Sequence, residues 1–261
     1  MDFSVVKEQF ADVNFDNKDF KRDVIWLVKD LPNKINSEEK QKLSHQIKRL
    51  YRGTPLAYVM GYVPFLNCKI FVNKNTLIPR QETELLVDII IKQNKINSPK
   101  TLDLCAGSGC IGIALAKELN AQTTCVEISD GAIKMIKKNA KENGVQVNII
   151  KSDMFENVSE KFDLIVSNPP YIPTNEIPTL DKSVKDFEPT LALDGGKSGL
   201  DFYEIITSNA HKHLKDNGIL ALEIGYNQAK DVKTLLKEHF KNIKVIKDYS
   251  KLDRFILAER R

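Results

Sequence analysis

The sequence has little of what marks disulfide-rich, metal-binding or membrane-spanning proteins. Its four cysteines, Cys68, Cys105, Cys110 and Cys125, form no C-x-x-C pair, and none stands at zinc-ligand spacing from a histidine. The most apolar stretch, residues 85–91, is far too short to span a bilayer. The opening residues show no basic segment followed by an apolar one, as a secretory signal would. We therefore expect a cytoplasmic protein with reduced thiols, no metal and no membrane contact.

Positive charge is in small excess, and the excess lies only in the N-terminal part of the chain. The net charge of the 261 residues is +4. Residues 1–75 carry 13 basic and 9 acidic side chains, whereas residues 76–261 carry 26 of each. Such a modest basic surface is usually a solvated face, although it can also meet an acidic partner such as RNA. The hydrophobic fraction of 42% is ordinary and allows a large buried core.

Two hydrophobic patterns divide the chain. In residues 1–60 apolar side chains recur every three or four positions, the spacing of a helical face. The members are Phe20, Val24, Leu27, Val28 and Leu31, and then Leu43, Ile47, Leu50 and Tyr51. Aromatic and β-branched residues dominate 61–80 and predict a β-hairpin. We predict an N-terminal helical bundle at 1–60, a hairpin linker at 61–80 and an α/β domain at 81–261.

From residue 81 onward strand and helix patterns alternate, which predicts an α/β fold with a doubly wound, mostly parallel sheet. Its strands are expected at 101–106, 123–129, 147–153, 162–168, 218–225, 243–248 and 254–259. Helices are expected at 82–94, 111–119, 130–144 and 200–215, with another after residue 225. Continuous apolar runs of this kind are typical of strands buried on both faces.

The first of these strands runs into a glycine-rich turn, DLCAGSGC, at residues 103–110. In open α/β sheets ligands bind at the carboxyl ends of the strands. Glycines there let the backbone approach a ligand, and the following helix offers free N–H groups. Gly107, Gly109 and Gly112 match the dinucleotide pattern G-x-G-x-x-G loosely, which alone is weak. A tight turn without a ligand is the alternative.

Two more strand ends favour a nucleotide. Glu127 ends the second strand, twenty residues after Gly107, where a carboxylate can accept from both ribose hydroxyls and would repel a 2′-phosphate. The third strand ends in SDMF, so Asp153 can accept from the exocyclic amine of adenine and Met154 can pack on the ring. Each residue alone is ordinary surface or core, but together with the turn they predict an adenosine pocket.

The fourth strand, FDLIVSNPPY at 162–171, ends at the same edge. Asn168 carries an acceptor oxygen, whereas Pro169 and Pro170 fix the backbone and donate no N–H. The Asn168 oxygen and the Pro169 carbonyl can accept both hydrogens of a planar NH₂ group, while Tyr171 holds its plane. The alternative is a proline turn that merely ends a strand.

The NPPY sequence resembles the [DNS]-P-P-[YFW] signature of S-adenosylmethionine-dependent methyltransferases that act on planar nitrogen. Nearly end to end, the chain resembles the HemK/PrmC family of protein-(glutamine-N5) methyltransferases of class I peptide chain release factors. The similar blocks are PLAYVMGYVPF (55–65), TLIPRQETELLV (76–87), DLCAGSGCIGIALA (103–116), VEIS (126–129), NPPYI (168–172), FEPTLALDGGKSGLDFY (187–203), EIGYNQ (223–228) and DRFILAER (253–260). Three positions depart from the family pattern, where glycine, aspartate and proline are usual: Cys105, Glu127 and Gln81.

The resemblance implies a seven-stranded class I methyltransferase domain that converts S-adenosylmethionine to S-adenosylhomocysteine. It implies cofactor binding by Cys105, Ala106, Gly107, Ser108, Gly109, Glu127, Met154 and Asn168, beside the Asp153 derived above. Asn168, Pro169, Pro170 and Tyr171 would hold the substrate glutamine, which lies in the GGQ loop of the release factor. The IPRQETE segment would cap the pocket, and the N-terminal bundle would grip the release factor.

Other functions remain open at this stage. An adenine-N6 nucleic-acid methyltransferase needs the same NH₂ clamp, but also a basic surface near the site, and residues 76–261 are charge-neutral. A dehydrogenase leaves NPPY unused, and a non-catalytic binding module has no need of Asn168 and Glu127. We expect a monomer without stable nucleic-acid binding or a dedicated general base. His211 and His213 are expected on a helix surface.

Overall fold

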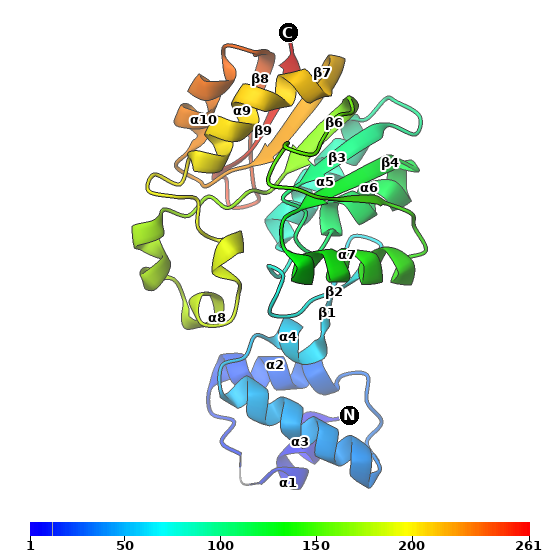
Figure 1. Cartoon of the computed structure of the whole chain (residues 1–261). Coiled ribbons are helices and arrows are strands. Elements are labelled where there is room, and N and C mark those ends of the chain that lie inside the picture. Colours follow the sequence, from blue (N-terminus) through cyan, green and yellow to red (C-terminus); the bar gives the residue numbers. More distant parts are fainter. Residues whose placement is uncertain (12) are drawn as a thin grey trace.

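The computed structural model describes residues 1–11 and 13–261. Figure 1 shows a group of helices at one end of the molecule, an α/β part at the other, and a short hairpin between them. The helices are α1 (Phe3–Gln9), α2 (Lys18–Val28), α3 (Ser37–Tyr51) and α4 (Leu56–Met60). Asn36 and Glu39 begin α3 with a reciprocal capping box. The predicted apolar face is buried at Val24, Val28, Leu43, Ile47 and Leu50, whereas Tyr51 is 65% exposed.

The hairpin is shorter than predicted. Its strands β1 (Tyr62–Phe65) and β2 (Cys68–Phe71) pair antiparallel, and the chain then runs without regular structure to residue 80. Asn139 holds β2 against a helix of the α/β part, because its side chain accepts from the Phe71 N–H at 2.8 Å and donates to the Phe71 carbonyl at 3.0 Å. This bonding leads the chain toward the edge of the sheet where the candidate site lies.

A seven-stranded sheet in the order β5-β4-β3-β6-β7-β9-β8 forms the α/β part (Figure 1). Its strands are β3 (Lys100–Leu104), β4 (Gln122–Glu127), β5 (Asn148–Lys151), β6 (Phe162–Ser167), β7 (Leu214–Glu223), β8 (Phe240–Lys247) and β9 (Asp253–Arg260). Strands β3 to β7 pair in parallel, and β9 runs antiparallel to β7 and β8. The predicted mostly parallel, doubly wound sheet is confirmed.

Helices cover both faces of the sheet, which explains the continuous apolar strand runs. On one face α5 (Gln81–Gln93), α6 (Cys110–Leu119) and α7 (Asp130–Glu142) share a core with Leu164 and Val166 of β6. On the other face α9 (Asp201–His213) and α10 (Ala229–Leu236) pack on Ile165 and its neighbours. Because successive strand residues point to opposite faces, β6 contributes to both cores. No helix in the described ranges is long and apolar enough to cross a membrane.

Two segments differ from the expectation. Strand β7 begins at Leu214 rather than at 218, directly after α9. The connection after β6 contains short helical turns that the sequence did not predict, at Thr174–Thr179, Lys182–Lys185 (α8) and Thr190–Ala192. Two of these turns follow a proline, Pro173 and Pro189, whose fixed φ suits the residue before a helical turn. This connection reaches the edge of the candidate site.

Candidate active site

A cavity opens where the carboxyl ends of β3, β4 and β6 meet, beside the point at which the strand order reverses. It encloses about 1120 Å³ including its open mouth. Of the predicted site residues, its wall contains Cys105, Ala106, Gly107, Ser108, Glu127, Asp153, Met154, Asn168 and Pro170. Gly109, Pro169 and Tyr171 are not part of the wall. The structure therefore brings most, but not all, of the predicted residues to one cavity.

The glycine-rich turn faces open space at one position only. A side chain at Gly107 would meet nothing within 4 Å, and the backbone there has φ +54°. A Cβ at Gly109 would lie 3.1 Å from Ile136, and one at Gly112 would lie 2.7 Å from the sulfur of Cys125. Gly109 and Gly112 thus let α6 pack against its neighbours, whereas Gly107 leaves room for a ligand beside the backbone.

Cys105 occupies a left-handed conformation with φ +61°. This backbone conformation favours glycine. The Cys105 sulfur lies 3.6 Å from that of Met154, which is also left-handed with φ +44°. Burial raises the pKa of the Cys105 thiol, so the thiol stays protonated at neutral pH. The two sulfur side chains form one apolar wall of the cavity.

Glu127 ties the first two strand ends together. One carboxylate oxygen accepts from the Gly107 N–H at 2.7 Å, and the other accepts from the N–H groups of Ile128 and Ser129, both at 2.9 Å. An ionised carboxylate offers about four lone-pair sites, and three of them are used here. The oxygen that faces Gly107 can accept one more bond, so Glu127 can orient the turn and still accept from a ribose hydroxyl. Ile128, which the sequence analysis missed, adds an apolar surface to the wall.

A second carboxyl, Asp103, lies buried behind the turn. Its Oδ2 accepts from the Gly112 N–H at 2.8 Å. Its Oδ1 is buried without a hydrogen-bond partner among the described residues. Burial raises the pKa of Asp103 to about 7, and this effect outweighs the bond from Gly112. Asp103 braces the turn from the core, outside the cavity wall.

The Asn168 side chain is held by two residues that the sequence analysis left without a role. Its Nδ2 donates to the Thr83 hydroxyl at 3.1 Å, and that hydroxyl donates to the Glu223 carboxylate at 2.6 Å. Thr83 belongs to the IPRQETE block and Glu223 to the EIGYNQ block. Both blocks were recognised in the sequence, and this recognition was the only signal available for them. Thr83 also lines the cavity.

The remaining sequence blocks brace the NPPY segment from behind. A Cβ at Gly195 would lie 2.7 Å from the Tyr171 Cα, so this glycine allows two backbones to touch. The Gln228 amide donates to the carbonyls of Tyr171 at 3.0 Å and Gly199 at 3.1 Å. The Tyr171 ring is half-buried against the core, and this burial raises the pKa of its hydroxyl. The predicted stacking role of Tyr171 stays a prediction.

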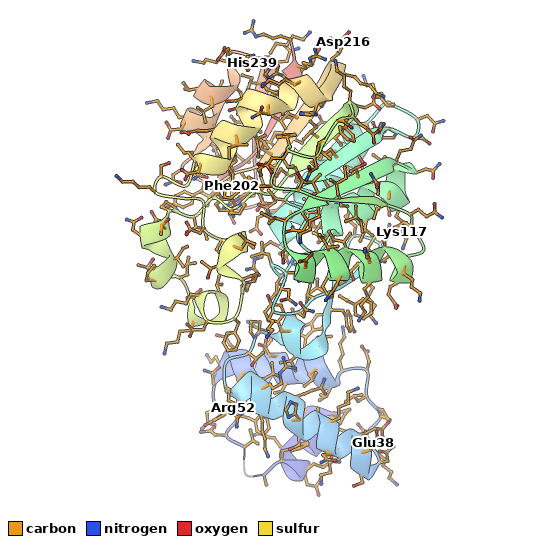
Figure 2. All side chains as sticks on the ribbon, viewed as in Figure 1. Glu38, Arg52, Lys117, Phe202, Asp216 and His239 are labelled. Carbon is orange, nitrogen blue, oxygen red and sulfur yellow. The ribbon has the colours of Figure 1, made fainter. Side chains whose placement is uncertain are left out.

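The rim of the cavity is formed by segments on either side of the sheet edge. Its residues are 74–77, Pro79, Pro189, Leu191 and Ala192, together with Phe202 at the start of α9, which is labelled in Figure 2. Arg80 and Glu188 form an ion pair beneath this rim. The IPRQETE segment therefore contributes Pro79 and Thr83 to the wall, while Arg80 is turned to its partner.

The two histidines considered in the sequence analysis lie outside the cavity wall. The ring of His211 stacks on His239 with centroids 3.7 Å apart, and that of His213 stacks on Phe155 at 4.9 Å. Figure 2 shows His239 at the end of the α/β part far from the N-terminal helices. Burial lowers the pKa of His211 and of His213. Neither is placed to take a proton from a substrate in the cavity.

Comparison with known proteins agrees with this geometry. A family model described as the methyltransferase small domain matches residues 80–183. A methyltransferase structure from Pyrococcus furiosus superposes with a TM-score of 0.59 at 18% identity, covering 83% of this chain and 98% of that one. A Thermus thermophilus 16S rRNA N2 G1207 methyltransferase, in complex with AdoMet and guanosine, gives 0.56 at 19% identity, covering 77% and 50%. The fold and the matched domain define a class I methyltransferase.

Sequence relatives narrow this class. The chain is 38% identical over 248 residues to the release factor glutamine methyltransferase of Clostridium acetobutylicum, which covers 92% of this chain and 87% of that protein. It is 39% identical over 247 residues to the protein of the same name from Thermodesulfovibrio yellowstonii, covering 92% and 88%. This chain belongs to the release factor glutamine methyltransferase family.

Proposed function

We propose that this chain transfers a methyl group from S-adenosylmethionine to the side-chain amide nitrogen of the glutamine in the GGQ motif of class I release factors. The observation that carries the proposal is the hydrogen bonding of the Asn168 side-chain amide. Its NH₂ is already bound to Thr83, which leaves its oxygen as the acceptor for a substrate in the cavity. An acceptor is what a glutamine NH₂ group requires.

The cavity suits the cofactor at each strand end. The turn from Cys105 to Gly109 would surround the methionine part, with open space at Gly107. Glu127 would accept from a ribose hydroxyl through its remaining lone pair. Asp153, Met154 and Ile128 would surround the adenine, the first through its carboxylate and the others through apolar contact. When bound, the sulfonium cofactor supplies an activated methyl group.

Orientation is the main task of the protein, because an amide nitrogen is a poor nucleophile. The Asn168 oxygen and the Pro169 carbonyl would accept hydrogen bonds from the glutamine NH₂ and orient its nitrogen toward the bound cofactor. The cofactor would supply its methyl group to this nitrogen and leave as S-adenosylhomocysteine. Positive charge develops on the nitrogen, so both hydrogen bonds strengthen in the transition state.

The proton that the nitrogen must lose passes to water. No histidine lies in the cavity wall among the described residues. The N-methylated, protonated amide is strongly acidic, so a dedicated base is not needed. Pro170 fixes the backbone after Pro169, and Tyr171 would hold the plane of the glutamine amide. These two roles rest on the residue types and their position after β6.

The N-terminal helices are proposed to hold the release factor away from the chemistry. This proposal divides the chain into a bundle at 1–60, a hairpin at 61–80 and a catalytic domain at 81–261. The excess of basic side chains in residues 1–75 supports contact with an acidic surface of the partner. The enzyme would act as a monomer in the cytoplasm, with no stable nucleic-acid partner.

A labelling experiment tests the proposal. Purified protein is incubated with radiolabelled S-adenosylmethionine and a release factor whose GGQ glutamine is intact or changed to alanine. We expect label on the intact factor only, and a loss on the order of 100-fold in Asn168→Ala. Cofactor affinity of the variant is measured separately. Label on duplex DNA or transfer RNA instead would favour a nucleic-acid methyltransferase, and bound cofactor without any transfer would favour a binding module.

A further inference from the structure

Three segments far apart in the sequence meet in one buried hydrogen-bond chain. Asn168 follows β6, Thr83 lies in the first turn of α5, and Glu223 ends β7. The two bonds measure 3.1 Å and 2.6 Å. Thr83 and Glu223 are each only 2% exposed. Buried polar groups that are joined by hydrogen bonds in this way hold one another in a defined orientation.

The direction of this chain follows from the number of protons available. A carboxylate only accepts, and a threonine hydroxyl has a single proton to give. Since Thr83 gives its proton to Glu223, its oxygen can only accept from Asn168. The atom of the Asn168 amide that faces Thr83 must therefore be the NH₂ nitrogen. The ionised Glu223 carboxylate therefore sets the orientation of the Asn168 amide.

We infer that Thr83 and Glu223 are positioning residues, which hold the Asn168 amide with its oxygen toward the substrate NH₂. The inference rests on the proposed function and extends it to a residue pair outside NPPY. If the amide rotated by half a turn, it would present its own NH₂ to the substrate, and two donors would face each other. The substrate would then lose the acceptor that aligns its nitrogen.

The negative charge of Glu223 determines that Thr83 donates to Glu223 and accepts from Asn168. The groups around it are Arg254 on β9, Arg80 just before α5, Glu82 in the first turn of α5, Tyr171 after β6, Tyr203 on α9 and Cys110 on α6. Burial raises the pKa of Glu223 to about 7, while the bond from Thr83 and the charge of Arg254 oppose the rise. A neutral carboxyl can donate as well as accept, so protonation removes the constraint on Thr83. Turnover should therefore fall as Glu223 takes up a proton.

The hydroxyl is tested by Thr83→Val, which keeps the shape of the side chain, and by Thr83→Ser, which keeps the hydroxyl. We expect Thr83→Val to lower kcat by about 10- to 100-fold, because the amide is no longer fixed. Thr83→Ser should recover most of this loss, and both should bind the cofactor like the wild type. Wild-type kcat in a folded Thr83→Val enzyme, or an equal loss in both variants, would overturn the inference.

The carboxylate is tested by the pH dependence of kcat. The wild type should lose activity toward acid with a midpoint near the pKa of Glu223, which the structure places at about 7. Glu223→Gln cannot titrate, so this acid limb should disappear. Asp103→Asn is the matched control, because Asp103 is also buried with a pKa near 7 but takes no part in the chain. An acid limb that persists in Glu223→Gln, or that vanishes in Asp103→Asn, would contradict the role of Glu223.

A spectroscopic readout separates this inference from the proposed function. In isotope-labelled protein the Asn168 side-chain NH₂ signals can be assigned by their absence in Asn168→Asp. They should shift with pH in step with Glu223 in the wild type, and not in Thr83→Val. This result does not require any substrate. If the Asn168 signals of the wild type did not change with pH, the hydrogen-bond chain would be rejected even if release factors are methylated. If the signals titrated but no release factor were methylated, the chain would stand and the proposed function would be rejected.

Discussion

The Glu188 carboxylate accepts a hydrogen bond from the backbone N–H of Ile78 at 2.9 Å, although 110 residues separate them. The same carboxylate pairs with Arg80 and is only 5% exposed. Through this contact the connection after β6 is fastened to the segment that precedes α5. Both segments form the rim of the cavity. The sequence blocks IPRQETE (78–84) and FEPTLALDGGKSGLDFY (187–203) are thus joined to each other at the rim of the cavity.

Glu188→Ala should weaken both folding and cofactor binding. The substitution leaves the buried Ile78 N–H without a partner and releases Arg80. We expect the free energy of unfolding to fall by about 2 kcal/mol, and cofactor affinity to fall with it. Denaturant titration and equilibrium dialysis measure the two quantities. Asp186→Ala, at an exposed site two residues away, is the control and should stay within about 0.5 kcal/mol of the wild type. Equal effects in the two variants would refute the fastening role.

Two glycines should respond differently to alanine. At Gly195 a Cβ would lie 2.7 Å from the Tyr171 backbone, so Gly195→Ala should lower the melting temperature strongly. At Gly107 a Cβ would meet nothing, although φ is +54°, so Gly107→Ala should cost only about 1 kcal/mol of stability while it weakens cofactor binding. Thermal melts with and without S-adenosylmethionine distinguish the two effects. Unimpaired cofactor binding in Gly107→Ala would show that the open space is not the cofactor site.

Asp103 should make the protein less stable as the pH rises. Burial raises its pKa from 3.8 to about 7 in the folded chain. Between these two values the folded state keeps a proton that the unfolded state has already lost. The stability that Asp103 contributes is therefore fully present below the pKa of the unfolded state, and it is lost as the pH rises through the pKa of the folded state. The free energy of unfolding of Asp103→Asn, relative to that of the wild type, should therefore rise by about 3 kcal/mol between about pH 5 and pH 8. Denaturant titrations at the two pH values measure it, and a constant difference between the two proteins would contradict the shift.

The left-handed backbone at Cys105 predicts a difference between two small replacements. Both Cys105→Gly and Cys105→Ala remove the thiol and its contact with Met154. Only glycine adopts φ +61° without a steric penalty, so Cys105→Gly should be more stable than Cys105→Ala by about 1 kcal/mol. Chemical denaturation at neutral pH gives the comparison. If alanine were the more stable replacement, the backbone would not be strained here.

The sequence predicted the sheet well because its strands are local apolar runs. The reversed direction of β9 was not predicted, since strand direction depends on contacts between β7 and β9 and not on the pattern within either strand. The residues expected to bind the cofactor at the ends of β3, β4 and β5 line one cavity, because the ends of parallel strands meet at one edge of the sheet. Thr83 and Glu223 received no role, because their bond joins residues 140 positions apart and only the fold reveals it. Tyr171 was expected to hold the plane of the substrate amide; it packs against the core and is not part of the cavity wall, and this role stays a prediction.

Peptide mass spectrometry of the methylated release factor gives the most direct test of the mechanism. The release factor is digested after reaction with the wild-type enzyme and with Asn168→Ala, and the modified atom is located by fragmentation. The clamp of Asn168 on a glutamine NH₂ predicts a single methyl group on the side-chain nitrogen of the GGQ glutamine, and almost none with the variant. A methyl group on another residue, or an equal yield from Asn168→Ala, would contradict it.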